Sequence, residues 1–170
     1  MIRTRRVRPS DAGVLAALVE RNRSFLRPWE PHRPDDYFTV AGQRQTIEWS
    51  LEQQALGVLV PQVILLDDEV VGRVTLERVT YGASRSCELH CWVSEHVNGR
   101  GVATDAVGQM RQYAFDVLEL HRIQAANLVH NQAAHKVLER NGFVRIGLAP
   151  RYLHVAGRWQ DHVLFQVLAE

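Results

Sequence analysis

The chain has 170 residues, of which 46% are hydrophobic and 23% charged, and its formal net charge is +1. A chain of this length buries enough surface to fold as one domain without disulfides or a structural metal, so we expect a single domain over residues 1–170. The balanced charge argues against direct nucleic-acid binding and against an anionic membrane as the main partner. The N-terminus lacks the apolar segment of a signal peptide, and no apolar stretch is long enough to span a bilayer, so we expect a cytoplasmic protein.

The first half of the chain predicts a strand, two helices and a group of antiparallel strands. The strand at Ile2–Val7 is followed by a helix that runs to about Phe25. A proline-broken loop precedes a second helix, which Thr39 can cap and Gly57 can close. Further strands are predicted at Val58–Leu66, Val70–Val79 and Cys87–Val93, the first two joined by an acidic turn.

The second half predicts two strand–helix units and a terminal hairpin. A glycine-containing loop opens a helix, the strand Ile123–Val129 follows, and Asn131 caps a helix that stops at Gly142. The remaining strands are predicted at Phe143–Gly147, Tyr152–Val155 and His162–Leu168. Early helices, antiparallel strands and then strand–helix units indicate a mixed α/β protein with helices on both faces of the sheet.

The loop and first helical turn at Val97–Thr104 have the composition of an anion site. The first turn of a helix leaves N–H groups unpaired, and the helix dipole favours negative charge there. Gly99 and Gly101 remove side chains that would keep a phosphate away. The segment lacks the P-loop pattern and the third glycine of the dinucleotide-binding fingerprint. An ordinary glycine turn before a helix is the alternative.

The same residues carry a family resemblance. Asn98–Ala103 resembles the motif Gln/Arg-x-x-Gly-x-Gly/Ala of the GNAT superfamily of N-acetyltransferases, with Asn98 replacing the usual Gln or Arg. Asn131–Phe143 resembles the family's Asn-x-x-Ser/Ala…Glu-Lys-x-Gly-Phe segment. Leu26–Trp29 and Tyr152–Leu164 resemble the RimJ/RimL branch, the ribosomal-protein-alanine N-acetyltransferases. The similarity runs along nearly the whole chain, with the motifs in the family's order.

The resemblance implies the GNAT fold and acetyl-CoA as co-substrate, without a metal. In that fold a mixed, mostly antiparallel sheet has two splayed parallel strands, here Cys87–Val93 and Ile123–Val129. The pantetheine arm would pair with the first strand, the pyrophosphate would meet the loop amides, and Asn131 would contact the pantetheine in addition to capping its helix. The expected acetyl-CoA contacts are Trp92, Val93, Ser94, Asn98, Gly99, Arg100, Gly101, Val102, Ala103, Thr104, Asn131 and Ala134.

The reaction implied is direct attack of a neutral amine on the thioester, which needs a proton acceptor. Glu88, His90 and Trp92 alternate onto one face of the predicted strand. A partly buried Glu88 can accept a proton, and the imidazole of His90 titrates near neutral pH. An internal salt bridge for Glu88 and a structural role for His90 are the alternatives.

A proton donor for the departing thiolate is harder to find. One GNAT branch has Tyr where this chain has Leu138, and the RimJ/RimL branch often has Ser where it has Ala134. Tyr152 is the substitute that we expect, and water or a purely structural Tyr152 is the alternative. Asp161 is expected to orient the terminal strands.

Aromatic and acidic residues in the loop Arg27–Phe38 suit a cationic acceptor, and Trp29, Glu30 and Tyr37 are the expected contacts, although a solvated loop with an aromatic anchor has the same composition. The leading hypothesis is acetylation of a protein N-terminus, possibly of a ribosomal protein. The alternatives are a small amine such as a polyamine, aminoglycoside or amino-acid derivative, and a CoA-binding module without catalysis. Monomer and homodimer are both left open.

Overall fold

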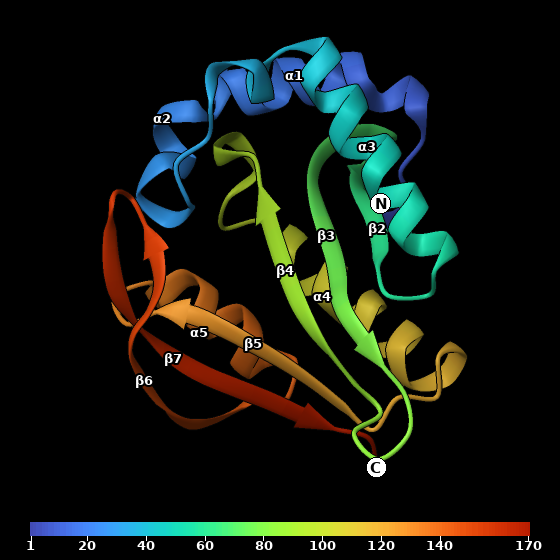
Figure 1. The fold of residues 1–170 in the computed structure, drawn as a ribbon, viewed down its shortest axis with the longest axis vertical. Helices are drawn as coiled ribbons and strands as arrows, with labels where there is room; N and C mark the ends of the chain where they lie inside the picture. The colour runs from blue at the N-terminus through green and yellow to red at the C-terminus, as the bar shows by residue number, and fades with distance from the viewer.

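A computed structural model describes all residues from 1 to 170, and its centre is one seven-stranded sheet in the order β1-β2-β3-β4-β5-β7-β6 (Figure 1). All neighbouring strands are antiparallel except β4 and β5, which are parallel. This confirms the predicted mixed, mostly antiparallel sheet. The strands are β1 (Ile2–Arg6), β2 (Val60–Leu66), β3 (Glu69–Thr80), β4 (Ser86–Val93), β5 (Arg122–Leu128), β6 (Val144–Val155) and β7 (Arg158–Leu168).

Helices cover both faces of the sheet, as predicted. On one face α1 (Ala12–Arg21) and α3 (Val40–Ala55) pack on β2 and β3. On the other face lie α4 (Val102–Gln112) and α5 (Gln132–Arg140). The short helical segments are α2 (Arg23–Leu26), the 3-10 turns Pro9–Asp11, Arg27–Trp29, Asp35–Phe38 and Glu95–Val97, and the π-helical turn Tyr113–Val117 that follows α4.

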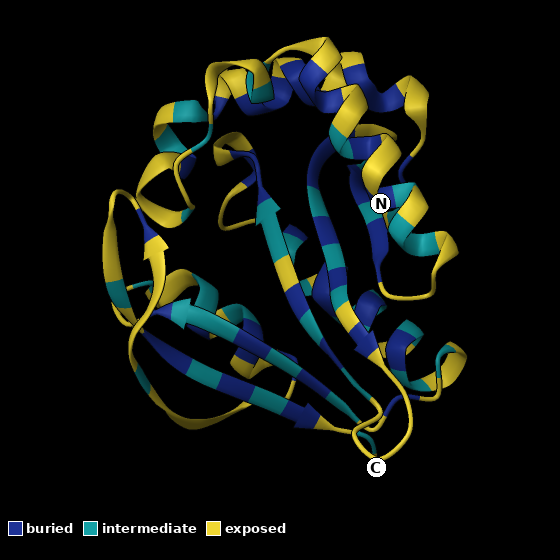
Figure 2. Cartoon of the chain, viewed as in Figure 1, coloured by how far each residue is buried: buried dark blue, intermediate teal, exposed yellow.

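The sheet separates two hydrophobic cores, because alternate residues of a strand point to opposite faces. The larger core joins β3, β4, β5 and β7 to α4, with Ile123, Met110 and Phe165 fully buried. The smaller core joins Leu15 and Ile47 of the covering helices to β2. Figure 2 shows the resulting alternation of buried and exposed residues along the strands. No helix is both long and apolar enough to cross a membrane.

Two predicted helix caps are confirmed. The hydroxyl oxygen of Thr39 accepts a hydrogen bond from the N–H of Gly42, 3.0 Å away. The side-chain oxygen of Asn131 accepts one from the N–H of Ala134 at 3.2 Å. Each bond satisfies an N–H group that the first helical turn leaves without a partner.

The first helix is shorter than predicted, because α1 ends at Arg21 and Asn22 separates it from α2. Asn22 is only 2% exposed, and its amide donates to the carbonyl of Leu18 and to the hydroxyl of Ser94, both at 2.8 Å. A buried side-chain amide that bonds the backbone competes with the helical pattern. Periodicity alone carries no sign of this partner, which lies 72 residues away.

The terminal strand β6 is continuous where two separate strands were predicted, because irregular pairing with β7 interrupts it without ending it. The register shifts between Ala149 and Leu153, and Arg151 adopts a φ of 48°. Asp161 accepts a hydrogen bond from the N–H of Arg151 at 2.8 Å. Asp161 therefore joins the two terminal strands, as expected.

Candidate active site

The two edges of β4 have different partners. Towards β3, pairing extends from Glu88 to Val93, the last residue of β4. Towards β5, pairing stops at Glu88, which lies opposite Gln124. Beyond this point β4 and β5 separate, and the backbone edge from Leu89 to Val93 has no strand beside it (Figure 1). An unpaired strand edge inside a sheet can bind an extended ligand through main-chain hydrogen bonds.

Close contact with β3 holds the end of β4 in place. A Cβ atom on Gly72 would lie 2.2 Å from the backbone oxygen of Trp92 and 2.9 Å from the Cα of Val93, so only glycine permits this approach. The N–H of Ser94 donates to the carbonyl of Val71 at 2.7 Å. The Oγ of Ser94 also bonds to Asn22, which fixes the end of β4 against α1.

The glycine loop lies just beyond this fixed strand end. Gly99 and Gly101 have φ values of 73° and 79°, which are left-handed conformations that favour glycine. A Cβ atom on either residue would meet no heavy atom within 4 Å, so the space in front of them is open. Gly101 is the N-cap of α4 and no side chain caps that helix, so the amides of its first turn remain available to an anion.

The other residues expected in this loop divide into exposed and buried positions. Asn98 and Arg100 are exposed. Val102 is 1% exposed and belongs to the larger core, so it can offer only its backbone N–H. Ala103 packs partly against the same core, and the carbonyl of Thr104 accepts a hydrogen bond from Asn141 at 3.1 Å. The backbone of this segment is therefore anchored by its core-facing side chains.

Four further residues expected to contact the coenzyme, Trp92, Val93, Ser94 and Asn131, differ in which of their polar groups are free. The backbone of Trp92 and Val93 borders the gap, whereas the N–H of Ser94 is already bonded to β3. A contact from Ser94 would therefore have to use its carbonyl. The oxygen of Asn131 caps α5 and its amide nitrogen has no partner in the structure, so both roles expected of Asn131 are compatible.

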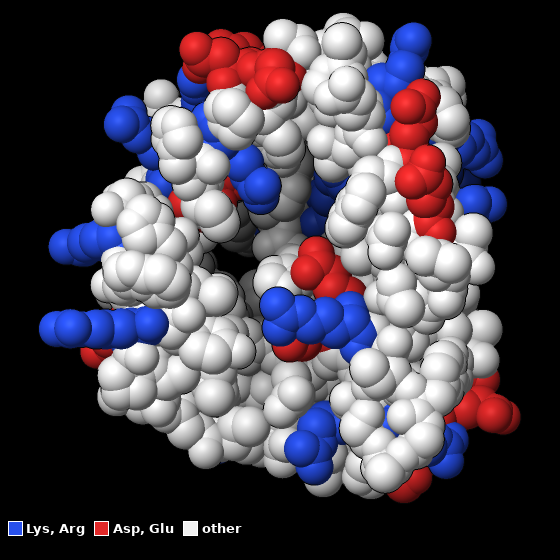
Figure 3. Space-filling model, in the orientation of Figure 1, with Lys and Arg blue, Asp and Glu red and all other residues white.

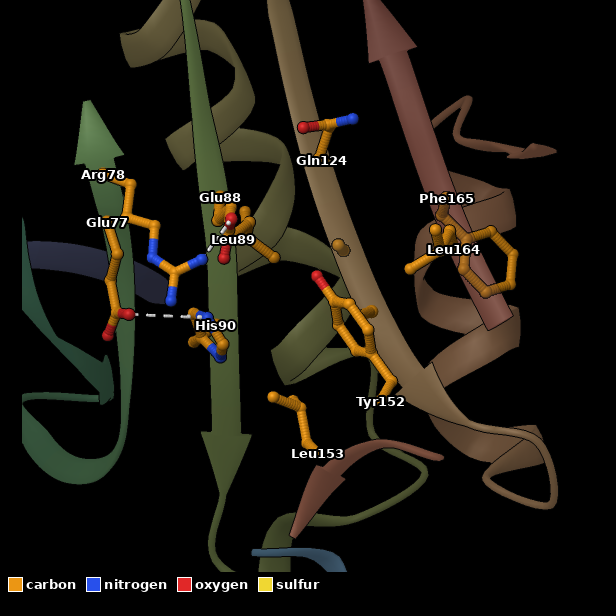
Figure 4. A pocket seen from close by; sticks show the side chains of 12 residues that line it. Glu77, Arg78, Glu88, Leu89, His90, Gln124, Tyr152, Leu153, Leu164 and Phe165 are labelled. Carbon is orange, nitrogen blue, oxygen red and sulfur yellow. Dashed lines mark hydrogen bonds and ion pairs between the residues drawn. The ribbon is translucent and has the colours of Figure 1, made fainter. Parts of the chain in front are cut away.

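A hollow opens between β4, β5 and the last part of β6, and we call it the strand-gap hollow (Figure 4). Its lining includes all three expected catalytic residues, Glu88, His90 and Tyr152. Glu88 is bonded to Arg78, with 3.0 Å between Oε1 and Nη1. Tyr152 points its hydroxyl towards the gap between β4 and β5. The lining residues are Glu77, Arg78, Glu88, Leu89, His90, Gln124, Ala125, Ala126, Tyr152, Leu153, Leu164 and Phe165.

A second hollow lies on the face covered by α3, and we call it the arginine hollow because Arg33 and Arg73 line it. Glu77 and His90 line both hollows, with 3.5 Å between Glu77 Oε2 and His90 Nε2 (Figure 4). The two hollows therefore meet at this Glu–His pair. The residues that line the arginine hollow are Arg33, Tyr37, Thr46, Trp49, Ser50, Leu59, Arg73, Thr75, Glu77, His90 and Trp92.

The three residues expected to bind the acceptor make different contacts. Tyr37 lines the arginine hollow, and the guanidinium carbon of Arg33 lies 4.8 Å from the centre of its ring. Trp29 lies instead against His130, with 5.3 Å between ring centres. The carbonyl of Glu30 accepts a hydrogen bond from the N–H of Ala156 at 3.1 Å. Trp29 and Glu30 thus connect the proline-rich loop to the far side of the strand gap.

Sequence reasoning missed Arg73 and Glu77, although β3 carries a signal for them. Arg73, Thr75 and Glu77 alternate with the buried core residues Val74 and Leu76. An alternating strand in the middle of a sheet places its polar side chains either in water or in an internal hollow. Recognising the hollow requires knowing that α3 leaves this part of the face open.

The two cysteines and the acidic and histidine side chains are not arranged for covalent or metal catalysis. Burial raises the pKa of both Cys87 and Cys91 to about 12, so neither thiol supplies a thiolate nucleophile at neutral pH. No group of three or more His, Cys, Asp or Glu residues is arranged to hold a metal ion. Leu138, at a position where some relatives carry a proton donor, is 3% exposed and packs in the larger core.

Comparisons with known proteins agree with this geometry. A family model described as an acetyltransferase (GNAT) domain matches residues 2–144. The chain belongs to the GNAT acetyltransferase family. This confirms the family predicted from the sequence, over a range that includes the glycine loop and the Asn131 segment.

Two full-length relatives and one solved structure sharpen the comparison. The chain is 33% identical to "Probable N-acetyltransferase YjcK" of Bacillus subtilis, with 95% of this chain and 92% of the relative covered. It is 30% identical to the [ribosomal protein uS5]-alanine N-acetyltransferase of Escherichia coli, with 94% and 84% covered. The structure of Mycobacterium smegmatis RimJ in complex with CoA-disulfide superimposes with a TM-score of 0.96 at 34% identity, with 99% and 82% covered.

Proposed function

We propose that this GNAT acetyltransferase transfers the acetyl group of acetyl-CoA to the α-amino group of a protein N-terminus. The observation that carries the proposal is the unpaired edge of β4 beside the open glycine loop at the start of α4. The relatives that match nearly the whole chain include a ribosomal-protein-alanine N-acetyltransferase and a RimJ structure with CoA. A ribosomal protein that begins with alanine is therefore the acceptor to test first.

The chain has the groups to hold each part of acetyl-CoA. The backbone of Trp92 and Val93 would pair with the pantetheine amides, and the amides from Gly99 to Thr104 would bind the pyrophosphate. Charge-assisted hydrogen bonds of this kind contribute about 1.5–3 kcal/mol each. When bound, acetyl-CoA supplies an activated acetyl group, and the protein supplies orientation and proton transfer.

We assign proton removal from the acceptor amine to His90. His90 lines both hollows, and Glu77 contacts its Nε2 atom. Glu88 lines only the strand-gap hollow, and one of its oxygens is already bonded to Arg78. We therefore give Glu88 the lesser role of adding negative charge near the amine. In this assignment Glu77 positions the imidazole and does not touch the reacting atoms.

The reaction forms a bond between the acceptor nitrogen and the acetyl carbonyl and breaks the carbon–sulfur bond. The amine loses its proton to His90, and the sulfur leaves as a thiolate that takes a proton. Tyr152 is the proposed donor, because its hydroxyl points into the gap where β4 and β5 separate. The two buried thiols take no part in this direct transfer.

Acetyl transfer to a panel of acceptors tests the proposal. The panel contains peptides with a free N-terminal alanine, the same peptides with a blocked N-terminus, and small amines including spermidine and free amino acids. We expect the free peptides to be acetylated on the α-amino group and the blocked peptides to be inert. Transfer only to small amines would replace the proposed acceptor, and no transfer to any acceptor would contradict the proposed activity.

A further inference from the structure

The arginine hollow contains a positive charge without an ionic partner. Arg73 is half-buried on β3, between strands on both sides, and its guanidinium forms no ion pair or side-chain hydrogen bond in the protein. Burial lowers the pKa of Arg73, and the nearby groups Tyr37, Glu77 and Asp11 offset this only in part. A guanidinium stays charged even so, because its ordinary pKa is far above neutral.

A second guanidinium adds to this charge. Arg33 lines the same hollow, its Nε is buried without a hydrogen-bond partner, and its closest carboxylate, Glu30, is 3.9 Å away. Arg33 and Arg73 disfavour each other's charge. Two guanidinium groups without a close carboxylate partner in one hollow suit an anionic ligand, because guanidinium groups form strong charge-assisted hydrogen bonds with carboxylates.

The hollow has opposite charges at its two ends. Glu77 and His90 mark the end that meets the strand-gap hollow, where the acceptor amine must arrive for reaction. Across β3 and β4, Thr75 lies opposite His90 and Arg73 lies opposite Trp92. Arg73 is thus one same-face step from Thr75, about 7 Å along the strand.

From this arrangement we propose that the arginine hollow is a carboxylate subsite, which selects acceptors that carry an acidic group a short distance from the reacting amine. The inference rests on the proposed acetylation of an α-amino group and narrows its acceptor class. Successive same-side residues of an extended peptide are also about 7 Å apart. An Asp or Glu near the N-terminus of the acceptor therefore matches the separation between the strand positions of His90 and Arg73.

The aromatic and hydroxyl groups around the arginines suit a peptide segment. Trp49 and Trp92 form apolar walls, and Thr46, Ser50 and Thr75 offer hydroxyl groups to a peptide backbone. Figure 3 shows that the molecule is hollowed near its centre, with acidic and basic side chains together at the margin. A polycation such as spermidine would place positive charge against the two guanidinium groups, so polyamines fit this hollow poorly.

The test compares matched peptides that begin with alanine and carry Asp or Asn at position 2, 3 or 4. Wild-type protein is expected to prefer Asp over Asn at one of these positions by at least tenfold in kcat/KM. Arg73→Met should reduce that preference to less than twofold, and Arg73→Lys should retain part of it. Arg44→Met is the matched control, because Arg44 is an exposed residue of α3 outside the hollow, and the full preference should remain.

Further experiments distinguish an acidic side chain from a free C-terminal carboxylate. They also distinguish failure of the carboxylate subsite from failure of the proposed acetyltransferase activity. Ala-Asn and its C-terminal amide distinguish a free α-carboxylate from an acidic side chain, and a preference for either carboxylate supports the subsite. Equal acetylation of Asp and Asn peptides, with no preference for the free dipeptide, would overturn the subsite and leave the proposed activity intact. If no peptide is acetylated, the proposed activity fails, and quenching of the protein's tryptophan fluorescence, to which Trp49 and Trp92 of the hollow contribute, still measures whether Asp peptides bind more tightly. Equal binding would then overturn the subsite as well.

Discussion

The two edges of β4 show how one strand can be both framework and binding surface. On the β3 side, pairing continues to Val93, and the close approach at Gly72 leaves no room for a side chain. On the β5 side, pairing ends after Glu88, and the glycines beyond the strand face open space. The closed edge fixes the position of the strand, and the open edge offers a preformed row of backbone groups to a ligand. Glycine therefore has opposite roles at the two edges: it permits close contact on the β3 side and leaves open space on the β5 side.

The largest expected effect comes from blocking the open side. Gly101→Glu would place a carboxylate where the pyrophosphate is proposed to bind, and we expect acetyl-CoA affinity to fall at least about 100-fold, or about 2.7 kcal/mol. Calorimetric titration measures the affinity, and the stabilisation of the wild-type protein by acetyl-CoA should be lost in a melting experiment. Gly57→Glu is the matched control, because Gly57 also has a positive φ, 77°, and open space before it. If both variants bind acetyl-CoA normally, the open edge is not the coenzyme site.

A smaller loss is expected where the open edge meets the acceptor. His90→Gln should lower kcat about 100-fold with little change in acetyl-CoA affinity, because general base catalysis typically contributes at least that factor. Glu88→Gln should lower kcat by less than about tenfold, since Arg78 already offsets that charge. Steady-state kinetics of both variants between pH 6 and 9 would show which of the two residues accepts the proton. The assignment is wrong if Glu88→Gln has the larger effect.

The closed edge predicts a change in stability. Gly72→Ala forces a Cβ atom onto the backbone of Trp92 and Val93, and we expect the free energy of unfolding to fall by about 1–3 kcal/mol. Because the backbone of β4 must shift, acetyl-CoA affinity should fall as well. Gly147→Ala, where nothing lies within 4 Å, should change stability by less than about 0.5 kcal/mol. Urea denaturation compares the two variants, and equal stabilities would mean that β4 is not held at Gly72.

The smallest effect concerns the loop that connects the helices to the far side of the gap. Burial raises the pKa of Glu30, and Arg33 opposes this only in part. The folded state therefore keeps the proton of Glu30 to higher pH than the unfolded state, so stability is lost as pH rises from about 4 through the raised pKa. Glu30→Gln should remove this loss and stabilise the protein at pH 7 by up to about 1 kcal/mol.

The exposed Glu52 provides the control for that experiment, because Glu52→Gln should leave the pH dependence of stability unchanged. Unfolding free energies at several pH values between 4 and 7 would test both variants. Identical pH profiles for wild type and Glu30→Gln would show that the burial of this carboxyl does not affect folding.

Much of the fold was predictable from local sequence. Strand alternation, the caps at Thr39 and Asn131 and the glycines of the loop each act within a few residues, and the structure confirms them. The break at Asn22 could not be predicted, because its cause is a hydrogen bond to Ser94. The π-helical turn Tyr113–Val117 after α4, where the N–H of Leu118 bonds to the carbonyl of Tyr113, likewise has no local signal that we recognised.

The residues of the candidate site likewise fall into those that local sequence predicts and those that depend on tertiary structure. The glycine loop and the strand that carries Glu88 and His90 follow from motifs and alternation. Arg73 and Glu77 are visible in the alternation of β3, but their importance depends on where α3 ends and where the two hollows meet. Trp29 has suitable chemistry for an acceptor, yet its contact with His130 places it away from the arginine hollow. The carboxylate of Glu30 lies beside Arg33, a lining residue of that hollow.

The most direct test is a crystal structure of the protein with bound CoA. We predict that pantetheine lies between β4 and β5 with main-chain hydrogen bonds to Trp92 or Val93, and that the pyrophosphate contacts amides between Gly99 and Thr104. Coenzyme bound at another surface, with the edge of β4 still unpaired and the glycine loop free of phosphate, would contradict the central claim.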